Sequence, residues 1–309
     1  MAPAHLAFMV LICLVWGFNF VAAKVGLGEL PPFLFTALRF VLVALLLLPF
    51  LRLHPGRMGQ IARIAVFAGS LHFGLVFLGL EIADASVVAV VAQLNVPFAT
   101  LLSIFWLGES VGWRRWAGIA VAFSGAALIG IDPNVIPDLG GILLVALGAL
   151  SIAAAMILMR RLAGGVKALE LQAWIAMLSW PPLLLMSLTV EAGQWRAIMQ
   201  APPVAWGALA YTAVGASIIG HAGFYWLLQR YEVSVTSPLT LMAPIFGMFF
   251  GITVLGEPFT WRIGAGAALT LLGVLIIALR ARAAHAAAPG AASAARTGRA
   301  AKAGAEPDG

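Results

Sequence analysis

The sequence predicts an all-α polytopic membrane protein with ten transmembrane helices, arranged as two five-helix repeats of opposite orientation. Three observations lead to this fold class: the composition, the spacing of apolar runs, and a repeat within the chain. Of the 309 residues, 62% are hydrophobic and 10% are charged, and the mean hydropathy is +1.03. Soluble proteins carry about 25% charged residues, and a water-soluble core cannot hide this much apolar sequence.

Apolar runs long enough to cross a bilayer recur along the chain, since a crossing takes about 20 mostly apolar residues. They predict helices at about 6–24, 33–51, 64–82, 86–107, 115–131, 139–159, 169–190, 206–229, 234–255 and 262–280. The connections are short, so neighbouring helices are expected to be antiparallel. Outer-membrane barrels use alternating segments of about ten residues instead. Residues 281–309, rich in alanine, glycine and basic residues, are predicted to form a disordered cytoplasmic tail.

A shift of 148 residues aligns the end of the fourth expected helix and the fifth with the ninth and tenth, without a gap. Between Phe98 and Gly125, 11 of 28 positions are identical. The identical pairs include Gly108/Gly256, Glu109/Glu257, Trp113/Trp261, Arg114/Arg262, Gly118/Gly266 and Gly125/Gly273. Each half then holds an odd number of helices, so the second half enters the membrane inverted, an arrangement that permits alternating access. We expect a first repeat at residues 1–132 and a second, inverted repeat at 133–280.

Lysine and arginine are distributed unevenly between the expected loops, which predicts the orientation. With the N-terminus inside, nine fall in inner loops and three in outer loops. The inner ones are Arg52, Arg57, Arg63, Arg114, Arg115, Arg160, Arg161, Lys167 and Arg230, and the outer ones are Lys24, Arg196 and Arg262. This bias predicts a multi-pass protein of the bacterial inner membrane with both termini in the cytoplasm.

One alternative concerns the first helix, because Val21-Ala22-Ala23 resembles a signal-peptidase site. No lysine or arginine precedes it, and Trp16, Gly17 and Asn19 interrupt the apolar run. Cleavage would also leave four helices against five and destroy the symmetry. We therefore expect the first helix to be retained.

Several function classes are excluded by composition and motifs. The net charge of +6 lies between apolar runs or in the tail, so no face could follow a nucleic-acid backbone. The single cysteine, Cys13, forms no disulfide framework or thiolate cluster, and no lysine stands in a phosphate-binding loop motif. No cofactor or metal site is predicted. The expected partners are the lipid bilayer and a small-molecule substrate, and the protein is expected to be a monomer or a homodimer.

The segment Val15–Gly26, which reads Val-Trp-Gly-Phe-Asn-Phe-Val-Ala-Ala-Lys-Val-Gly, resembles the start of EamA-type carriers of the drug/metabolite transporter superfamily. Pro31-Pro32, Leu38-Arg39-Phe40, Arg230-Tyr231-Glu232, Ser237-Pro238-Leu239 and Pro244 continue the resemblance, which covers about residues 6–280. It implies ten helices in a 5+5 inverted arrangement around a central cavity, with the fifth and tenth helices largely outside the substrate path. Within the family, the sequence is most similar to exporters of cysteine and O-acetylserine.

One position departs from the family pattern. The second-half counterpart of Trp16 is often tryptophan in this family, whereas Ser151-Ile152-Ala153 occupies that place here. The polar lining of the sixth helix is correspondingly thin, and the resemblance therefore leaves the substrate open.

Ionisable side chains inside apolar runs need a reason, because insertion scales give a cost of about 2.5–3.5 kcal/mol for a central arginine. Arg39 lies some seven residues into the second helix and could clamp a substrate carboxylate with its planar fork. Alternatively, it could snorkel to the surface or bind a backbone carbonyl. His72 and His221 lie near the middle of the symmetry-related third and eighth helices and could couple transport to protons. Alternatively, they are neutral and hydrogen-bonded between helices.

Uncharged side chains complete the candidate substrate site. Asn19, Gln93 and Asn95 could bind the charged groups of a small zwitterion, although interhelical amide hydrogen bonds compete as an explanation. Gln93 and Asn95 are two residues apart and face different sides unless Pro97 distorts the turn. The aromatic candidates for the cavity wall are Trp16, Trp174 and Tyr225.

These features predict a carrier that exports small polar metabolites by alternating access, with amino acids of the cysteine and O-acetylserine kind as expected substrates. An alternative is a broad exporter of aromatic amino acids, cations or drug-like compounds; the lack of a mid-membrane carboxylate argues against cations. A remote alternative is an intramembrane enzyme, for which two histidines and one cysteine make a poor catalytic set. A purely structural protein would leave the repeat unexplained.

Overall fold

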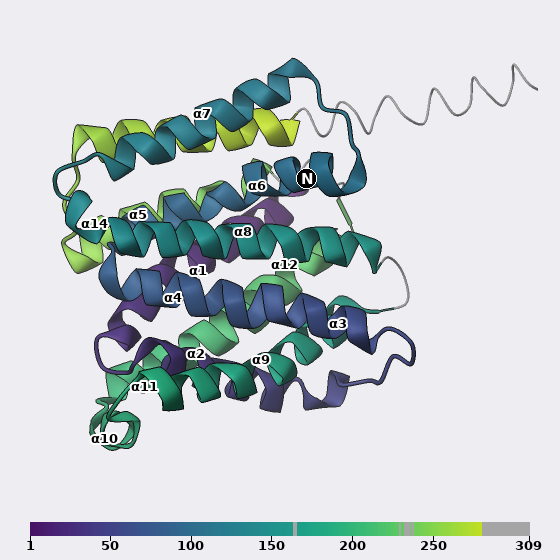
Figure 1. The fold of residues 1–309 in the computed structure, drawn as a ribbon, viewed down its shortest axis with the longest axis vertical. Coiled ribbons are helices and arrows are strands. Elements are labelled where there is room, and N and C mark those ends of the chain that lie inside the picture. Colours follow the sequence, from purple (N-terminus) through teal and green to yellow (C-terminus); the bar gives the residue numbers. More distant parts are fainter. Residues whose placement is uncertain (163–165, 229, 232–235, 237, 280–309) are drawn as a thin grey trace, which may run out of the picture.

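The computed structural model describes the chain except for residues 163–165, 229, 232–235, 237 and 280–309, and the side chains of Ala222, Tyr225 and Leu228 (Figure 1). The described part is helical between its turns and contains no strand. This confirms the all-α prediction. The predicted disordered tail, 281–309, lies outside the described residues.

The first half of the chain contains four long rods and a shorter helix. They are α1 (Pro3–Leu27); α2 (Pro32–Leu46) with the short η1 (Leu48–Phe50); α3 (Met58–Ala65), η2 (Val66–Leu71) and α4 (His72–Ile82) in one rod; α5 (Ala85–Val91), η3 (Ala92–Leu94) and α6 (Asn95–Leu107) in another; and α7 (Trp113–Gly130). The rod of α3 to α4 begins six residues before the predicted start at residue 64. Its first turns have a polar face, carrying Gln60 and Arg63, that a hydropathy criterion leaves out.

The second half follows a similar plan. Its elements are η4 (Ile136–Asp138) with α8 (Leu139–Arg161), α9 (Ala168–Val190), α10 (Gln194–Gln200), the rod of α11 (Pro203–Ala210), η5 (Tyr211–Gly220) and α12 (His221–Leu228), then α14 (Met242–Leu255) and a C-terminal helix, Trp261–Leu279. The sequence did not predict the short α10. Among the described residues, seven helices are long and apolar enough to cross a membrane, and Pro32–Leu46 and Met242–Leu255 are shorter apolar helices.

Two glycines end equivalent helices in the same way. Gly108 follows α6 with φ of 67°, and Gly256 follows α14 with φ of 70°. This left-handed conformation is a common helix terminator and is costly for residues with a Cβ. The shared Gly-Glu pair of the sequence repeat therefore marks a structural stop at both places.

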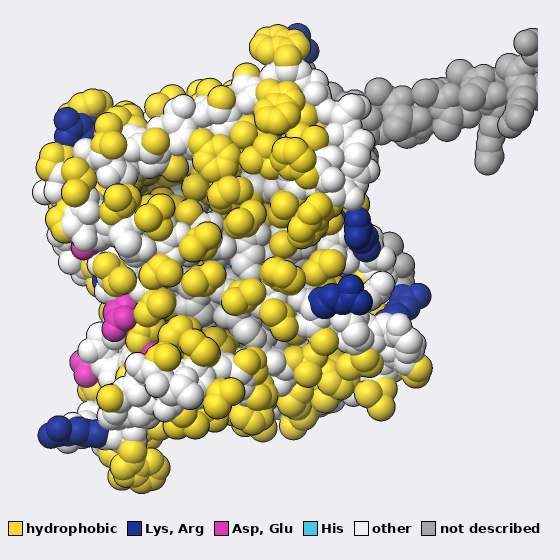
Figure 2. All heavy atoms as spheres, in the orientation of Figure 1, with side chains coloured by type: hydrophobic (Ala, Val, Ile, Leu, Met, Phe, Trp, Pro, Cys, Tyr) yellow, Lys and Arg dark blue, Asp and Glu magenta, His cyan; other side chains and the backbone are white. Residues whose placement is uncertain are grey.

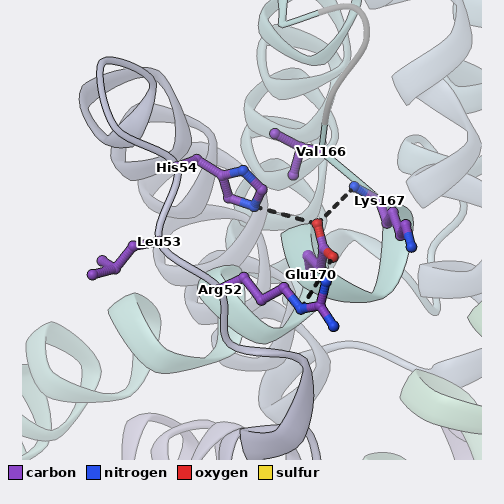
Figure 3. Close-up of a pocket in the computed structure, with 6 residues that line it drawn as sticks. All are labelled: Arg52, Leu53, His54, Val166, Lys167 and Glu170. Atoms are coloured by element: carbon purple, nitrogen blue, oxygen red, sulfur yellow. Dashed lines mark hydrogen bonds and ion pairs between the residues drawn. The ribbon is translucent and has the colours of Figure 1, made fainter.

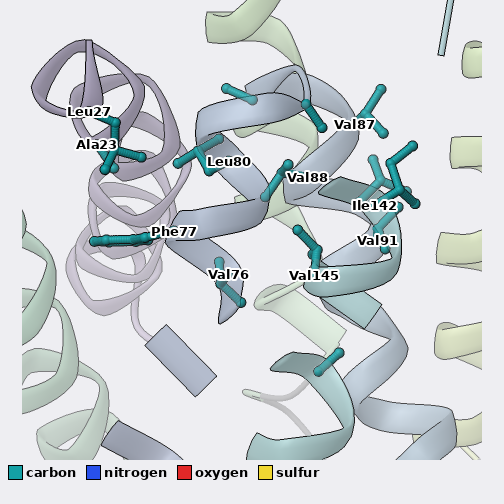
Figure 4. Close-up of a cluster of buried hydrophobic side chains, with 14 of the residues drawn as sticks. Ala23, Leu27, Val76, Phe77, Leu80, Val87, Val88, Val91, Ile142 and Val145 are labelled. Atoms are coloured by element: carbon teal, nitrogen blue, oxygen red, sulfur yellow. The ribbon is translucent and has the colours of Figure 1, made fainter. Parts of the chain in front are cut away.

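The helices pack in pairs that join the two halves of the chain. α1 lies along α14 and the η5 rod, α4 lies along α8, and α2 lies along α9 (Figure 1). α5, α4 and α1 also meet α8 around a buried cluster that includes Phe77, Val88 and Val145 (Figure 4). Each half therefore stabilises the other through shared buried clusters.

α7 and the C-terminal helix form a separate pair at one edge of the bundle (Figure 1). Their backbones approach where Gly118 faces Gly273 and Gly125 faces Gly266, and Thr270 Oγ1 donates to the Ala122 carbonyl at 3.4 Å. A Cβ on Gly125 would lie 2.5 Å from the Gly266 carbonyl oxygen, so no larger residue fits there. The glycines shared by the two halves therefore permit this close packing.

The outer surface of the bundle is apolar. Figure 2 shows hydrophobic side chains covering the long faces of the helices, with carboxylates gathered at one edge of that view. Large side chains such as Leu143 and Leu147 of α8, and Leu185 and Leu188 of α9, are exposed. In a soluble protein such a surface would aggregate, whereas in hydrocarbon it is the expected exterior.

A loop contact at one end of the bundle joins the turn after α7 to the turn before the C-terminal helix. Thr260 Oγ1 donates to Asp132 Oδ2, and Asp132 Oδ1 accepts the backbone N–H of Asn134 at 2.9 Å. The Thr260 hydroxyl, with the Asn134 groups, holds the pKa of the Asp132 carboxyl below its ordinary value of 3.8. The ionised carboxylate therefore stabilises the connection between the two turns.

Replacing Asp132 by asparagine should lower the thermal unfolding temperature at neutral pH. A carboxyl whose pKa is lowered on folding contributes its full stability above the unfolded-state pKa and loses it as the pH falls through the folded-state pKa. The difference between wild type and Asp132→Asn should therefore disappear in acid below the ordinary pKa. Unfolding scans of both proteins across pH measure this, and a difference that is independent of pH would contradict the assignment.

Candidate functional site

Arg39 is the largest fully buried side chain in the described part of the bundle. It lies in the middle of α2 and is 1% exposed. Its Nε and Nη2 groups donate to Ser217 Oγ at 3.3 and 2.9 Å, and the Ser217 hydroxyl donates to the Thr212 carbonyl at 2.9 Å. Nη1 is buried without a hydrogen-bond partner among the described residues, and no described carboxylate lies within ion-pair distance of the guanidinium. The cation is therefore only partly compensated.

Three phenylalanine rings surround this guanidinium. Its central carbon lies 4.3 Å from the centroid of Phe73, 5.3 Å from Phe77 and 5.9 Å from Phe40. Aromatic faces attract cations, by about 2 kcal/mol or more where water is excluded. The rings lower the cost of burying the charge, but they give Nη1 no acceptor.

His72 and His221 each follow a π-helical segment. η2 precedes His72 and η5 precedes His221, and the repeat shift of 148 places residues 66–71 on 214–219, inside η5. π-helical turns are rare and are frequent at functional sites. The same irregularity therefore occurs at equivalent depth in both halves of the chain.

The two histidines bind backbone carbonyls through Nδ1. His72 Nδ1 lies 2.9 Å from the Gly148 carbonyl of α8, and His221 Nδ1 lies 2.9 Å from the Ala216 carbonyl of η5. Because a carbonyl only accepts, each contact requires the proton on Nδ1 and makes Nε2 the nitrogen that can accept one. Arg39, His72 and His221 also lie within electrostatic range of one another. The structure therefore brings these three predicted site residues together.

α1 contributes two of the predicted side chains to the same region. Trp16 Nε1 donates to the Ala216 carbonyl at 3.2 Å, and its ring centroid lies 5.4 Å from that of His221. One turn further along, Asn19 Oδ1 is buried without a hydrogen-bond partner in the described part. Tyr211 of η5 donates to the Val15 carbonyl at 3.0 Å and joins α1 to η5. Among the described residues, Asn19 thus supplies a hydrogen-bond acceptor without a partner, and Arg39 supplies a donor without a partner.

The other predicted site residues lie elsewhere or are not described. Trp174 Nε1 donates to the Arg52 carbonyl at 2.7 Å in the loop after η1, away from the Arg39 group. Gln93 and Asn95 flank the end of a 3₁₀ turn before Pro97, are half-buried, and make no side-chain hydrogen bond within the described residues. Tyr225 belongs to α12, and its side chain lies outside the described residues.

Sequence reasoning missed Ser217, Thr212 and Phe73. A serine or threonine in an apolar run is ordinary, and a phenylalanine there is indistinguishable from the lipid-facing ones. Only a signal that placed η5 opposite Arg39 could have identified them, and a single sequence holds no such signal.

Apolar helices that expose their hydrophobic faces and enclose a buried, partly compensated cation define a multi-pass membrane protein with a polar centre. The chain belongs to the EamA-like transporter family, whose sequence model matches residues 4–131 and again 139–279. The resemblance seen in the sequence is thereby confirmed. Family membership argues against an intramembrane enzyme.

Several curated relatives are similar over most of the chain. A "Probable amino-acid metabolite efflux pump" of Salmonella typhimurium is 28% identical over 275 residues, which cover 86% of this chain and 92% of the relative. A protein of the same name from Escherichia coli is also 28% identical, with the same coverage. The "Uncharacterized transporter YoaV" of Bacillus subtilis is 26% identical, covering 86% and 93%.

A solved structure has a similar fold. The crystal structure of one protein superposes with a TM-score of 0.62 at 19% identity, covering 91% of this chain and 99% of the other. At this identity the likeness concerns the fold alone.

Proposed function

We propose that this transporter exports small zwitterionic metabolites across a bacterial inner membrane, with amino acids of the cysteine and O-acetylserine kind as substrates. The observation that carries the proposal is the buried Nη1 of Arg39, a charged donor without an acceptor. A substrate carboxylate would satisfy it by a charge-assisted hydrogen bond. The unused Asn19 Oδ1 would accept from the substrate ammonium group.

Transport would proceed by alternating access between two five-helix repeats, 1–132 and 133–280, that together form ten transmembrane helices. The double match of the family model supports this division. The packing of α7 against the C-terminal helix supports it as well. Under the repeat shift of 148, Gly118 corresponds to Gly266 and Gly273 to Gly125, so the Gly118–Gly273 contact is equivalent to the observed Gly125–Gly266 contact. Such an exchange is expected of a pseudo-twofold axis in the membrane plane.

The proposed orientation places both termini in the cytoplasm. The unequal distribution of lysine and arginine between the loops supports it. In Figure 2 the visible carboxylates lie at one edge, which would be the outer side. The relatives named as probable amino-acid metabolite efflux pumps support an outward direction of transport.

Counterflow in proteoliposomes tests the substrate class. Labelled cysteine and O-acetylserine should exchange, whereas their methyl esters, which lack the carboxylate, should exchange at least tenfold more slowly, the typical effect of losing one hydrogen bond to a charged group. Running the assay with and without a pH gradient tests whether the two histidines couple flux to protons. Equal exchange of acids and esters would contradict the role of Arg39, and exchange of aromatic amines in their place would favour the broad exporter.

A further inference from the structure

A recess of about 490 Å³ opens at the end of the bundle where the loop between η1 and α3 meets the start of α9 (Figure 3). Arg52, Leu53, His54, Val166, Lys167 and Glu170 line it. Arg52 and Lys167 are cationic, and Glu170 is the one carboxylate among these six residues. The recess is separate from the group around Arg39.

The Glu170 carboxylate faces inward and is already used. Its side chain is 7% exposed, and Oε2 accepts the Lys167 backbone N–H at 3.1 Å, closing the first turn of α9. His54 Nε2 approaches the same oxygen at 3.3 Å. The negative charge therefore stabilises the helix start and the loop.

The two cations keep most of their binding capacity. Arg52 Nε is 3.9 Å from Glu170 Oε1, beyond hydrogen-bond distance, and the Arg52 side chain is 71% exposed. Lys167 Nζ makes no hydrogen bond or ion pair within the described residues, and Figure 3 shows its tip turned away from the Glu170 carboxylate. The backbone at Arg52 is meanwhile fixed, because its carbonyl accepts Trp174 Nε1–H at 2.7 Å. The recess is thus a frame of loop and helix backbone with two available cations.

Exposed apolar residues place this frame at the boundary of the hydrocarbon. Leu53, next to Arg52 at the edge of the recess, is 75% exposed and extends away from Glu170 (Figure 3), and Leu48 and Phe50 are also exposed. In water these side chains would have no partner, whereas in a bilayer they reach the acyl chains. A cation beside them lies at the level of the lipid phosphates, where each basic residue contributes about 1 kcal/mol of attraction to anionic lipid.

We propose that Arg52 and Lys167 bind the phosphate group of an anionic membrane phospholipid in this recess, with its acyl chains lying along Leu48 and Leu53. The site is separate from the Arg39 group, because it lies between the loop after η1 and the start of α9 at the end of the bundle. A phosphodiester keeps its negative charge at physiological pH and matches two cations at the hydrocarbon boundary. The chain thereby has a specific lipid contact on the face that the sequence predicts to be cytoplasmic.

Native mass spectrometry of the purified full chain in neutral detergent tests the proposal by titration with phosphatidylglycerol or phosphatidylethanolamine. Wild type should retain phosphatidylglycerol and show little retention of phosphatidylethanolamine. The double variant Arg52→Gln/Lys167→Gln should bind phosphatidylglycerol about 30-fold more weakly, which corresponds to two surface cations. The control Arg114→Gln/Arg115→Gln removes two cations at the start of α7 and should leave retention unchanged.

Two further measurements distinguish loss of the binding site from loss of folding, and a phospholipid from free phosphate. The charge-conserving variant Arg52→Lys/Lys167→Arg should restore binding, which separates loss of the site from loss of folding. Inorganic phosphate at millimolar concentration should not displace the lipid, because it lacks the acyl chains. Displacement by inorganic phosphate, equal retention of both lipids, or an equal loss in the control variant would overturn the proposal.

Discussion

Replacing Arg39 by glutamine is expected to reduce transport of carboxylated substrates by roughly 10- to 100-fold, the value of a hydrogen bond to a charged group. Thermal stability should stay the same or rise. Nη1 of Arg39 has no partner in the described part, and the rest of the guanidinium meets only Ser217 and aromatic faces. Neutralising a buried, poorly compensated charge removes its desolvation cost. Function and stability should therefore move in opposite directions.

A fall in transport without a fall in thermal stability separates a substrate-binding role of Arg39 from a structural role. If Arg39 only pinned α2 to η5 through Ser217, its loss would lower the unfolding temperature and the transport rate together. Transport measured in proteoliposomes, with unfolding measured in the same detergent preparation, gives both quantities. Unchanged transport by Arg39→Gln would remove Arg39 from the substrate site.

Two matched variants refine the test. Arg39→Lys keeps the charge but loses the planar fork and should restore only part of the transport rate. Ser217→Ala removes the acceptor that orients Nε and Nη2 while leaving Arg39 in place, so it should raise KM more than it lowers kcat. A methyl ester substrate should be insensitive to Arg39→Gln, because the ester has no carboxylate to bind.

The helices themselves could be predicted because a helix that crosses the hydrocarbon needs about 20 mostly apolar residues. The expected run 6–24 corresponds to α1, Pro3–Leu27, and 169–190 corresponds to α9, Ala168–Val190. The π-helical segments could not be predicted. In a run where nearly every residue is apolar, the sequence carries no periodicity that distinguishes a π-helical turn from an α-helical one. The polar first turns of α3 and the short α10 were missed because neither is a continuous apolar run.

The candidate site was partly predictable for a related reason. Arg39, His72 and His221 are noticeable because ionisable groups are rare in apolar runs, and the structure does bring them together. Trp174 lies on α9, which packs against α2, the helix that carries Arg39. Its indole N–H nevertheless donates to the Arg52 carbonyl in the loop after η1. Its position along the chain gives a depth in the membrane, whereas its partner depends on which face of α9 meets which loop. That relation is set by tertiary packing.

Replacing Glu257 by glutamine is expected to open one end of the transporter. Glu257 is buried, and its Oε1 and Oε2 accept the backbone N–H groups of Ala85 and Ser86 at 2.6 and 2.8 Å, which closes the N-terminus of α5. Lys24 holds the other side of the same turn by donating to the Leu80 carbonyl at 2.7 Å and the Ala83 carbonyl at 2.8 Å. A glutamine can accept only through its single oxygen, so one of the two N–H groups would be left unpaired.

The repeat-equivalent residue, Glu109, provides the matched control. Glu109 Oε1 accepts from Arg160 Nη2 at 2.8 Å in a partly exposed pair, and this hydrogen bond holds the pKa of the Glu109 carboxyl below its usual range. Exposed ion pairs contribute at most about 1 kcal/mol. The described contacts of the two sequence-equivalent glutamates thus differ: Glu257 caps α5, and Glu109 pairs with Arg160.

A single-cysteine reporter measures this difference. In a Cys13→Ala background, the substitution Ala89→Cys places the only thiol on α5. Ala89 is fully buried and lies one helical turn after Ala85 and Ser86, whose N–H groups Glu257 accepts. An unpaired buried N–H costs about 1–3 kcal/mol, so Glu257→Gln should increase labelling by a membrane-impermeant maleimide roughly 5- to 150-fold. Glu109→Gln should leave the labelling at wild-type level or below.

The comparison between the two variants decides the mechanism. An equal increase in Glu109→Gln and Glu257→Gln would mean that either substitution merely loosens the fold, and unchanged labelling in both would mean that this turn does not open. An increase confined to Glu257→Gln means that the contact seen here closes one of two exchangeable ends. Among the described contacts, the Glu257 carboxylate caps α5 whereas the Glu109 carboxylate pairs with Arg160, so the two substitutions remove different interactions at sequence-equivalent positions.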